Sequence, residues 1–173
     1  MKPVVLVASM LLLAACAARD TGHTAVRRGT SPPDSSVLWP ARGIVLGRAE
    51  AHVVVRQCSR AALDTGSVRG YWTPSRPQIA ELEAGLTPLL RSKLEGDGNV
   101  RRFRREHLSE YFRQYAGLVV GPRRIIYVNG FMTMDTTTWR HPEIVCDGGA
   151  NFFGVEYDPA TRVFSGFSFN GSA

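Results

Sequence analysis

The sequence lacks the short motifs that identify the common cofactor and catalytic sites. It contains no P-loop, no G-x-G-x-x-G dinucleotide fingerprint and no G-x-S-x-G nucleophile elbow. No two of its histidines, His23, His52, His107 and His141, have a metal-ligand spacing such as H-x-x-x-H, and no cysteine pair assists them. We therefore expect no metal, no cofactor and no catalytic residue in this chain.

Long apolar runs are missing as well. The N-terminal run from Val4 to Leu13 carries no charge, and only Ser9 interrupts its apolar side chains. Its length of about ten residues falls short of the roughly 20 that a membrane-spanning helix needs. Because Lys2 precedes it, the run is typical of the apolar core of a signal peptide.

The residues that end this run, Leu13-Ala14-Ala15-Cys16, predict where the chain goes. They resemble the bacterial lipobox, in which a leucine and two small residues precede a cysteine. The resemblance implies that the Cys16 thiol receives a diacylglycerol group, that residues 1–15 are cut off as a signal peptide, and that the new amine is acylated. An ordinary secretory signal is the alternative, because Ala15-Cys16-Ala17 also fits a small-x-small cleavage site.

The residues after Cys16 predict a tether and a membrane. In lipoproteins of enteric Gram-negative bacteria an Asp after the cysteine favours retention at the inner membrane, so Ala17 implies the outer membrane, facing the periplasm. Residues 16–40 are rich in Ser, Thr, Gly, Pro and charge and have too little apolar surface to offset their ordering entropy. We therefore predict a lipidated, flexible tether over 16–40 and a single periplasmic domain over 41–173.

The composition is that of a globular protein with a basic surface. Hydrophobic residues make up 44% and charged residues 21% of the chain. The formal net charge of +6 becomes +5 when residues 1–15, which include Lys2, are removed. A positive excess favours anionic partners such as lipid headgroups or anionic glycans, and a merely soluble basic surface is the alternative. Nucleic acid is not expected, because its recognition motifs are absent and the compartment is wrong.

Two cysteines, Cys58 and Cys146, remain once Cys16 is lipidated. In an oxidising, exported setting such a pair suggests one disulfide. Their positions differ by 88 (146 minus 58), and the chain-entropy model assigns about 4 to 5 kcal/mol to closing a loop of that size. Two buried free thiols are the alternative.

The clearest helix signal begins at Ser75. Ser75 and Gln78 have the spacing of a capping box, and an apolar face follows at helical spacing, formed by Ile79, Leu82, Leu86, Leu89 and Leu90. We expect Pro88 to kink or end this helix near Thr87.

A second helix is predicted from Arg104 to Tyr115. Its apolar face consists of Leu108, Tyr111, Phe112 and Tyr115, and Gly117 is placed to stop it. Upstream, Gly43–Leu46 reads as a short strand, whereas Ala49–Leu63 is either a helix or contains a strand over His52–Arg56.

From Leu118 onward the apolar period changes to two. Leu118–Val120 and Arg124–Tyr127 flank Gly121-Pro122-Arg123, which predicts a hairpin. Asn129-Gly130 is either a second tight turn or part of one long strand that continues to Met132. We favour the long strand, because apolar residues point to both of its faces.

The last segment predicts a hairpin between Phe153 and Phe169. Its turn is Asp158-Pro159-Ala160-Thr161, with Asp at the first position and Pro fixing φ at the second. The predicted fold class is therefore α+β: two helices followed by an antiparallel β-meander, with the helices on one face of the sheet.

Two groups of residues are candidates for binding. In the loop Asp147-Gly148-Gly149-Ala150-Asn151 the glycines allow a backbone concavity for an anion, and Asp147 with Asn151 offers oxygens to a cation. A tight connection beside the predicted disulfide is the plainer interpretation. His141 and Asp135 form an acid–base set with Asp147 only if the fold brings them together, and nothing in the sequence does so.

The second candidate is an arginine cluster at 101–105. Arg101, Arg102, Arg104 and Arg105 stand at the start of the predicted second helix, where cations oppose the helix dipole. They form either a docking patch for phosphate, lipid A or an acidic protein, or a neutral feature of the surface.

Beyond the signal, the chain resembles small lipoprotein-type proteins of Gram-negative bacteria. The segments that carry this resemblance are Tyr115-Ala116-Gly117, Val145-Cys146-Asp147-Gly148-Gly149 and Tyr157-Asp158-Pro159. It implies a location and a fold but no activity. Our prediction is a membrane-anchored envelope lipoprotein that serves as a non-enzymatic binding or structural module. The alternatives are a periplasmic inhibitor of a cell-wall hydrolase, acting through loop 147–151, and a cell-envelope enzyme.

Overall fold

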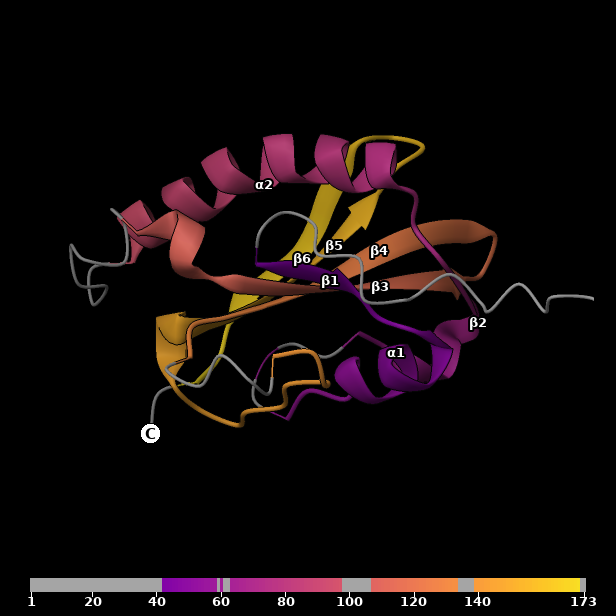
Figure 1. Ribbon diagram of the computed structural model, residues 1–173, viewed down its shortest axis with the longest axis horizontal. Helices are drawn as coiled ribbons and strands as arrows, with labels where there is room; N and C mark the ends of the chain where they lie inside the picture. The colour runs from indigo at the N-terminus through magenta and orange to yellow at the C-terminus, as the bar shows by residue number, and fades with distance from the viewer. Residues whose placement is uncertain (1–41, 59, 61–62, 98–106, 134–138, 172–173) are drawn as a thin grey trace, which may run out of the picture. The chain divides into compact units, whose positions relative to one another are not determined.

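The computed structural model describes residues 42–58, 60, 63–97, 107–133 and 139–171 (Figure 1). The predicted signal peptide, Cys16, the tether over 16–40 and the arginines of 101–105 lie outside the described residues. No helix in the described part is long and apolar enough to cross a membrane.

Six described strands form one mostly antiparallel sheet. They are β1 (Gly43–Val45), β2 (Val68–Trp72), β3 (Phe112–Val120), β4 (Arg123–Phe131), β5 (Phe152–Asp158) and β6 (Val163–Phe169). The strand order is β1-β3-β4-β5-β6, and β2 also pairs with β3. Three short 3₁₀ turns lie at Thr65–Ser67, Leu108–Glu110 and Gly149–Asn151.

Strand β3 has partners along both of its edges. On one edge β1 runs parallel to its first half, with Gly43 opposite Arg113, and β2 runs antiparallel to its second half, with Trp72 opposite Gly117. On the other edge β4 pairs antiparallel with the whole of β3. β1 and β2 therefore lie one after the other along the same edge of β3.

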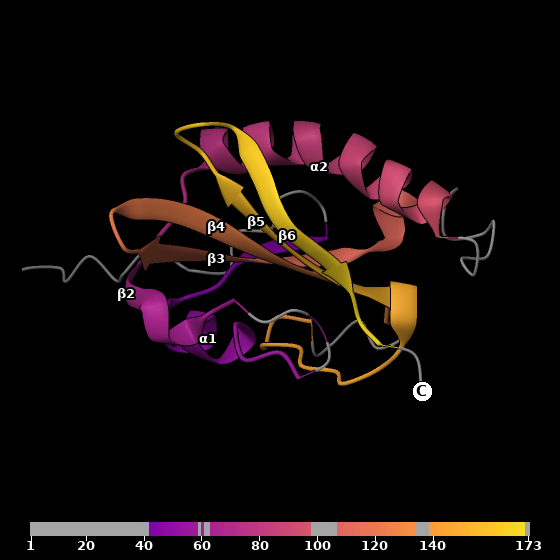
Figure 2. The same ribbon diagram turned by 180° about the vertical axis from the view of Figure 1, so that it is seen from behind.

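The helices α1 (Arg48–Val54) and α2 (Arg76–Gly96) cover opposite faces of this sheet (Figure 1, Figure 2). One core lies under α2 and includes Leu82, Leu86 and Leu90 of the helix with Ile126 and Val155 of the sheet. A second core lies under α1 and includes Ala51 and Val54 with Phe112, Leu118 and Phe131. The α+β class is confirmed, but the expectation that both helices lie on one face is wrong.

Helix α2 begins where its capping signal predicts. The backbone N–H of Ser75 donates to Oε1 of Gln78 at 2.9 Å, and the capping box is formed. The helix does not end at Thr87, because it continues through Pro88 to Gly96. Leu82, Leu86, Leu90 and Leu94 are fully buried against the sheet, and this burial outweighs the one backbone hydrogen bond that proline removes.

The predicted helix over 104–115 is wrong. Residues 104–106 lie outside the described residues, Leu108–Glu110 is a 3₁₀ turn, and the rest of the segment begins β3. Residues 112–118 of this strand are all buried, Phe112 and Ala116 under α1 and Tyr115 under α2. A strand buried on both faces shows no polar alternation, so its apolar run resembles that of a buried helix.

Both predicted hairpins are confirmed. Gly121 and Pro122 connect β3 to β4, and Asn129 and Gly130 belong to the long strand β4 that we favoured over a second turn. In the β5–β6 turn the Asp158 carboxylate accepts the backbone N–H of Ala160 at 2.9 Å. The short strand at Gly43 is also present, and of the two possibilities for 49–63 the helix is found over residues 49–54, as part of α1.

Gly117 is required inside β3 and does not stop a helix. A Cβ at this position would lie 2.1 Å from the carbonyl oxygen of Trp72 and 2.9 Å from Cδ of Pro74. The backbones of β2 and β3 meet here, so neither neighbour can rotate away.

We predict that Gly117→Ala lowers the free energy of unfolding by about 1 to 3 kcal/mol, as overpacking does. Gly96→Ala is the matched control, because no atom lies within 4 Å of its added Cβ, and it should be neutral or slightly stabilising. Urea denaturation of both variants checks this. Equal midpoints for the two variants would contradict the close approach of β2 to β3.

Candidate anion-binding site

A groove of about 350 Å³ lies between α1 and β2. Its lining is polar and basic, and we name it the basic groove: Arg48, His52, Val55, Arg56, Thr65, Gly66, Val68, Arg69, Gly70 and Tyr71. The residues that could bind a charged ligand are Arg48, His52, Arg56, Arg69 and Tyr71.

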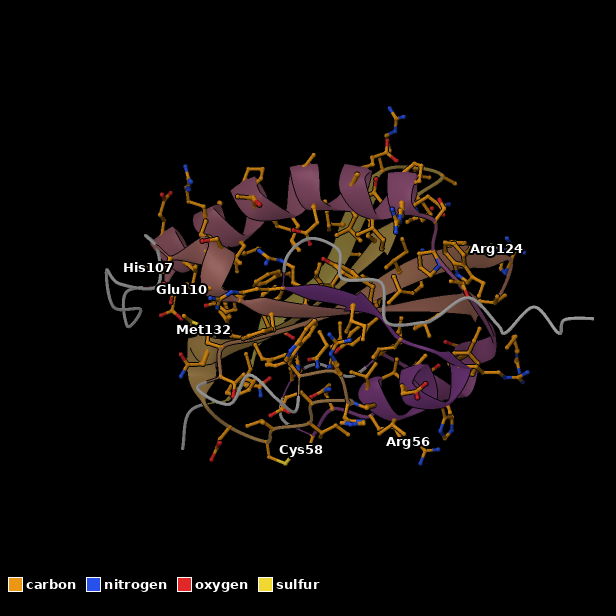
Figure 3. The ribbon with its side chains drawn as sticks, viewed as in Figure 1. Arg56, Cys58, His107, Glu110, Arg124 and Met132 are labelled. Atoms are coloured by element: carbon orange, nitrogen blue, oxygen red, sulfur yellow. A yellow bond between two sulfur atoms is a disulfide. The ribbon has the colours of Figure 1, made fainter. Side chains whose placement is uncertain are left out.

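Helix α1 and the residues directly after it place three of these side chains close together. Ala51 and Val54 are buried against the sheet, so the opposite side of the helix faces outward. Arg48 and His52 lie one helical turn apart on α1, and Arg56 follows two residues after the helix ends at Val54. All three are exposed, and Figure 3 shows Arg56 on the outer side of α1, beyond the face of the sheet that α2 does not cover.

Contacts within the basic groove hold the rings and guanidinium groups together. Nη2 of Arg56 lies 2.8 Å from Nε2 of His52. Because a guanidinium group only donates, His52 accepts at Nε2 and carries its proton on Nδ1 in this arrangement. The Arg48 guanidinium carbon lies 6.0 Å from the centre of the Tyr71 ring, and the His52 ring meets Tyr71 edge-on at 6.4 Å.

The positive charge of the basic groove is not neutralised by neighbouring acids. Among the described residues, the ion pairs Arg113–Glu83, Arg162–Glu81 and His107–Glu110 do not involve any groove residue. Asp64 is engaged with the backbone N–H of Gly66 at 3.0 Å, and neither it nor Glu50 lines the groove. The groove therefore presents three guanidinium groups with no acidic partner among the described residues, and guanidinium groups can bind phosphate and carboxylate oxygens in a bidentate manner.

A second hollow of about 530 Å³ lies at the turns of the two hairpins. Its Arg124 lies 5.7 Å from the centre of the Trp72 ring, and Figure 3 shows it at the β3–β4 end of the sheet, away from Arg56. The lining also includes Asp158, so this hollow lacks the one-sided charge of the basic groove.

A buried polar network under α1 fastens the segment 139–146 to the sheet. Nη2 of Arg60 donates to Oδ1 of Asn129 at 2.5 Å, and Nδ2 of Asn129 donates to Oε1 of Gln114 at 3.0 Å. Nε2 of Gln114 donates to the carbonyl of Trp139 at 2.8 Å, and Nδ2 of Asn129 also reaches the carbonyl of Glu143 at 2.9 Å. The segment 139–146 contains no strand, so these side-chain hydrogen bonds, and not backbone pairing, attach it to the sheet.

Arg60 is the residue of that network whose hydrogen bonding is least complete. It is 7% exposed, and its Nε and Nη1 have no hydrogen-bond partner among the described residues. Burial lowers the pKa of Arg60 and raises the pKa of Tyr127 beside it. Both groups lie over Gly154, where a Cβ would come within 2.7 Å of the Tyr127 hydroxyl and 3.0 Å of Arg60.

On the α2 side, Arg113 makes a second buried polar group. Its Nε lies 3.2 Å from Oε2 of Glu83, and its Nη1 donates to the carbonyl of Tyr111 at 2.8 Å. The Tyr115 hydroxyl donates to Oε1 of Glu83 at 2.7 Å. Burial raises the pKa of Glu83 and outweighs the opposing effects of Arg113 and Tyr115. This cluster joins α2 to β3 within the core, and its residues line neither of the two hollows described above.

The predicted loop 147–151 is a tight connection held by the C-terminal segment. Gly148 has φ of 91°, and the N–H of Gly149 donates to the carbonyl of Gly171 at 3.0 Å. The N–H of Asn151 donates to the carbonyl of Gly148 at 3.1 Å, and Nδ2 of Asn170 donates to the carbonyl of Asp147 at 3.0 Å. These bonds use the amides of Gly149 and Asn151 within the protein, so they do not point toward a ligand.

The predicted disulfide is confirmed. Cys58 and Cys146 are bonded, with an S–S distance of 2.06 Å and a Cα–Cα distance of 5.1 Å. The bond joins the segment after α1 to the segment that the buried network holds. Cys16, Asp135 and the arginines at 101–105 lie outside the described residues, and no group of three or more His, Cys, Asp or Glu residues in the described part could hold a metal.

The sequence reasoning missed the basic groove. Arg48, His52 and Arg56 recur every fourth residue, and the last two lie in the segment 49–63, for which the sequence allows either a helix or a strand. Read as a helix, that spacing alone would have aligned them. Arg69 and Tyr71 reach the groove only because β2 pairs with β3, which no local pattern indicates.

Comparison with known proteins adds no relative: no family model, no curated protein and no solved structure matches this chain.

The buried network yields a stability prediction. Asn129→Leu leaves the Arg60 guanidinium and Oε1 of Gln114 without Asn129, and leaving a buried donor without its partner costs about 1 to 3 kcal/mol, and more when the donor is charged. Arg60→Met removes the charge itself. We therefore expect the double variant to be more stable than Asn129→Leu alone, as measured by urea denaturation. If Arg60→Met instead added its own cost to the double variant, Arg60 would have a stabilising partner other than Asn129.

Proposed function

We propose that this protein is a lipid-anchored envelope protein whose domain binds an anionic partner through the basic groove, without catalysing a reaction. The observation that carries this proposal is the set of three guanidinium groups, Arg48, Arg56 and Arg69, that have no acidic partner in the described part of the chain. Arginines in such a groove suit recognition of oxyanions.

The anchor is proposed from the sequence. Leu13-Ala14-Ala15-Cys16 supports lipidation at Cys16, and Ala17 supports an outer-membrane location facing the periplasm. The Cys58–Cys146 disulfide agrees with export, because such bonds persist in oxidising compartments. Two or more acyl chains on Cys16 would hold the protein at the membrane without a spanning helix.

The groove supports binding better than the two alternatives. An inhibitor acting through loop 147–151 would need free groups there, whereas the amides of Gly149 and Asn151 are bonded within the protein. An enzyme would need paired acid and base groups in a hollow. Glu83 and Tyr115, two neighbouring groups with raised pKa, lie between α2 and the sheet and line neither of the two hollows.

The anchor predicts a specific mass. The full-length protein, produced in a Gram-negative host and taken from the membrane fraction, should begin at Cys16 and carry acyl chains. Its mass should rise by two protons on reduction, since one disulfide is opened. The Cys16→Ser variant should lose the acyl mass. A soluble product that begins after Ala17 would contradict the anchor.

The proposed groove predicts that two pairs of arginines contribute unequally to heparin binding. The unlipidated mature chain, with Cys16→Ser, should elute from immobilised heparin at lower salt when Arg56 and Arg69 are replaced by Gln. Arg76→Gln with Arg91→Gln is the matched control, because both residues are exposed on α2 and the charge change is equal. Equal elution of the two double variants would show that net charge alone binds heparin.

A further inference from the structure

We propose that the basic groove binds the phosphate headgroups of the membrane that holds Cys16, so that the domain docks on that membrane through α1. This inference rests on the proposed function, because it takes the membrane from the predicted lipid anchor. It names the anionic partner that the proposed function leaves open.

The first argument is chemical. Arg48, Arg56 and Arg69 surround a hollow of about 350 Å³, which is open to solvent and has no acidic side chain in its lining. Guanidinium groups match the oxygens of a phosphate with paired N–H donors. The N–H groups of Gly66 and Gly70 belong to residues of the same lining, but the N–H of Gly66 is bonded to Asp64. The arginines therefore carry the recognition.

The second argument is the surface beside the groove. Val53 of α1 is 41% exposed and Ile144 is 40% exposed, and they are two of the three large hydrophobic side chains exposed in the described part of the chain. The disulfide and the bond from Gln57 to the Glu143 carbonyl hold the segment of Ile144 next to the end of α1. Figure 1 shows α1 and this connecting segment on the same side of the sheet.

Apolar side chains beside cations are the pattern of surfaces that lie in a membrane interface. Tyr71, half-buried in the groove, fits the same setting, because amphipathic aromatic rings collect at headgroup level. A purely soluble anion would need the arginines but would leave Val53 and Ile144 without a partner. This is why we assign the phosphate to a lipid headgroup.

The third argument is the length of chain between the predicted anchor at Cys16 and the groove. The predicted tether ends at residue 40, eight positions before Arg48 at the start of α1 (48 minus 40). A chain with the composition of residues 16–42 has a root-mean-square end-to-end distance of about 30 Å. An anchor at that range holds the groove at an effective concentration near millimolar at the membrane surface. Weak contacts to single headgroups are then sufficient for docking.

The test uses the mature chain with Cys16→Ser, so that no acyl group contributes to binding. It is mixed with vesicles of phosphatidylglycerol and phosphatidylcholine, or of phosphatidylcholine alone, and bound protein is measured by sedimentation. We expect binding to the anionic vesicles that weakens as salt is added. Each arginine near an anionic surface contributes about fivefold in affinity, so Arg56→Gln with Arg69→Gln should weaken binding about 25-fold.

Three controls decide the outcome. Arg76→Gln with Arg91→Gln should bind within about twofold of the parent, since α2 covers the other face of the sheet. Val53→Ser should weaken binding while leaving the charge unchanged. Thermal unfolding of every variant tests whether the domain is intact, and the side chains substituted within the domain, at positions 53, 56, 69, 76 and 91, are exposed.

Two results would overturn the inference. Equal loss in the two double-arginine variants would show that the groove has no special part in binding. Inorganic phosphate that shifts the amide signals of Gly66, Gly70 and Tyr71, together with no vesicle binding, would assign the groove to a soluble phosphate. Neither result bears on the lipid anchor, which the mass of the membrane-fraction protein tests separately.

Discussion

The burial of β3 on both faces is the constraint on which the rest of the structure depends. Its side chains alternate between a core under α2 and a core under α1, so each face of the sheet requires a helical cover. Its edges are also fully used, by β1 and β2 on one side and β4 on the other. The short helix α1 follows β1 directly and is therefore placed beside β2. The basic groove lies where these two elements meet.

The same strand also carries the polar residues that fix its two covers. Arg113 points toward α2, where it meets Glu83, and Gln114 points toward the α1 side, where it meets Asn129. Two adjacent residues of β3 therefore bind elements on opposite faces of the sheet. Buried polar groups of this kind cost free energy unless their partners are in place. They therefore penalise alternative registers of β3, because a shift by one residue would exchange the two faces.

Local signals were sufficient wherever local interactions decide the structure. Ser75 and Gln78 define the start of α2, and Asp158 and Pro159 define the last turn. The pairing of Cys58 with Cys146 followed from assigning Cys16 to the lipobox, which leaves two of the three cysteines. The segment 112–115 was misread because tertiary burial removes the polar alternation of a strand. The groove was missed for a related reason: Arg69 and Arg48 are 21 positions apart (69 minus 48), and only the pairing of β2 with β3 brings them together.

The arginines of the groove carry an energetic argument of their own. Like charges that face one hollow repel each other, and neither Asp64 nor Glu50 lines the groove. A bound anion removes that repulsion, and because the groove exists only when β2 is paired and α1 is packed, the anion also stabilises the folded state by mass action. On our proposal the membrane supplies that anion at high local concentration. Docking and folding of the α1 layer would then favour each other, since the phosphate binds only the assembled groove and the tether keeps the phosphate within reach.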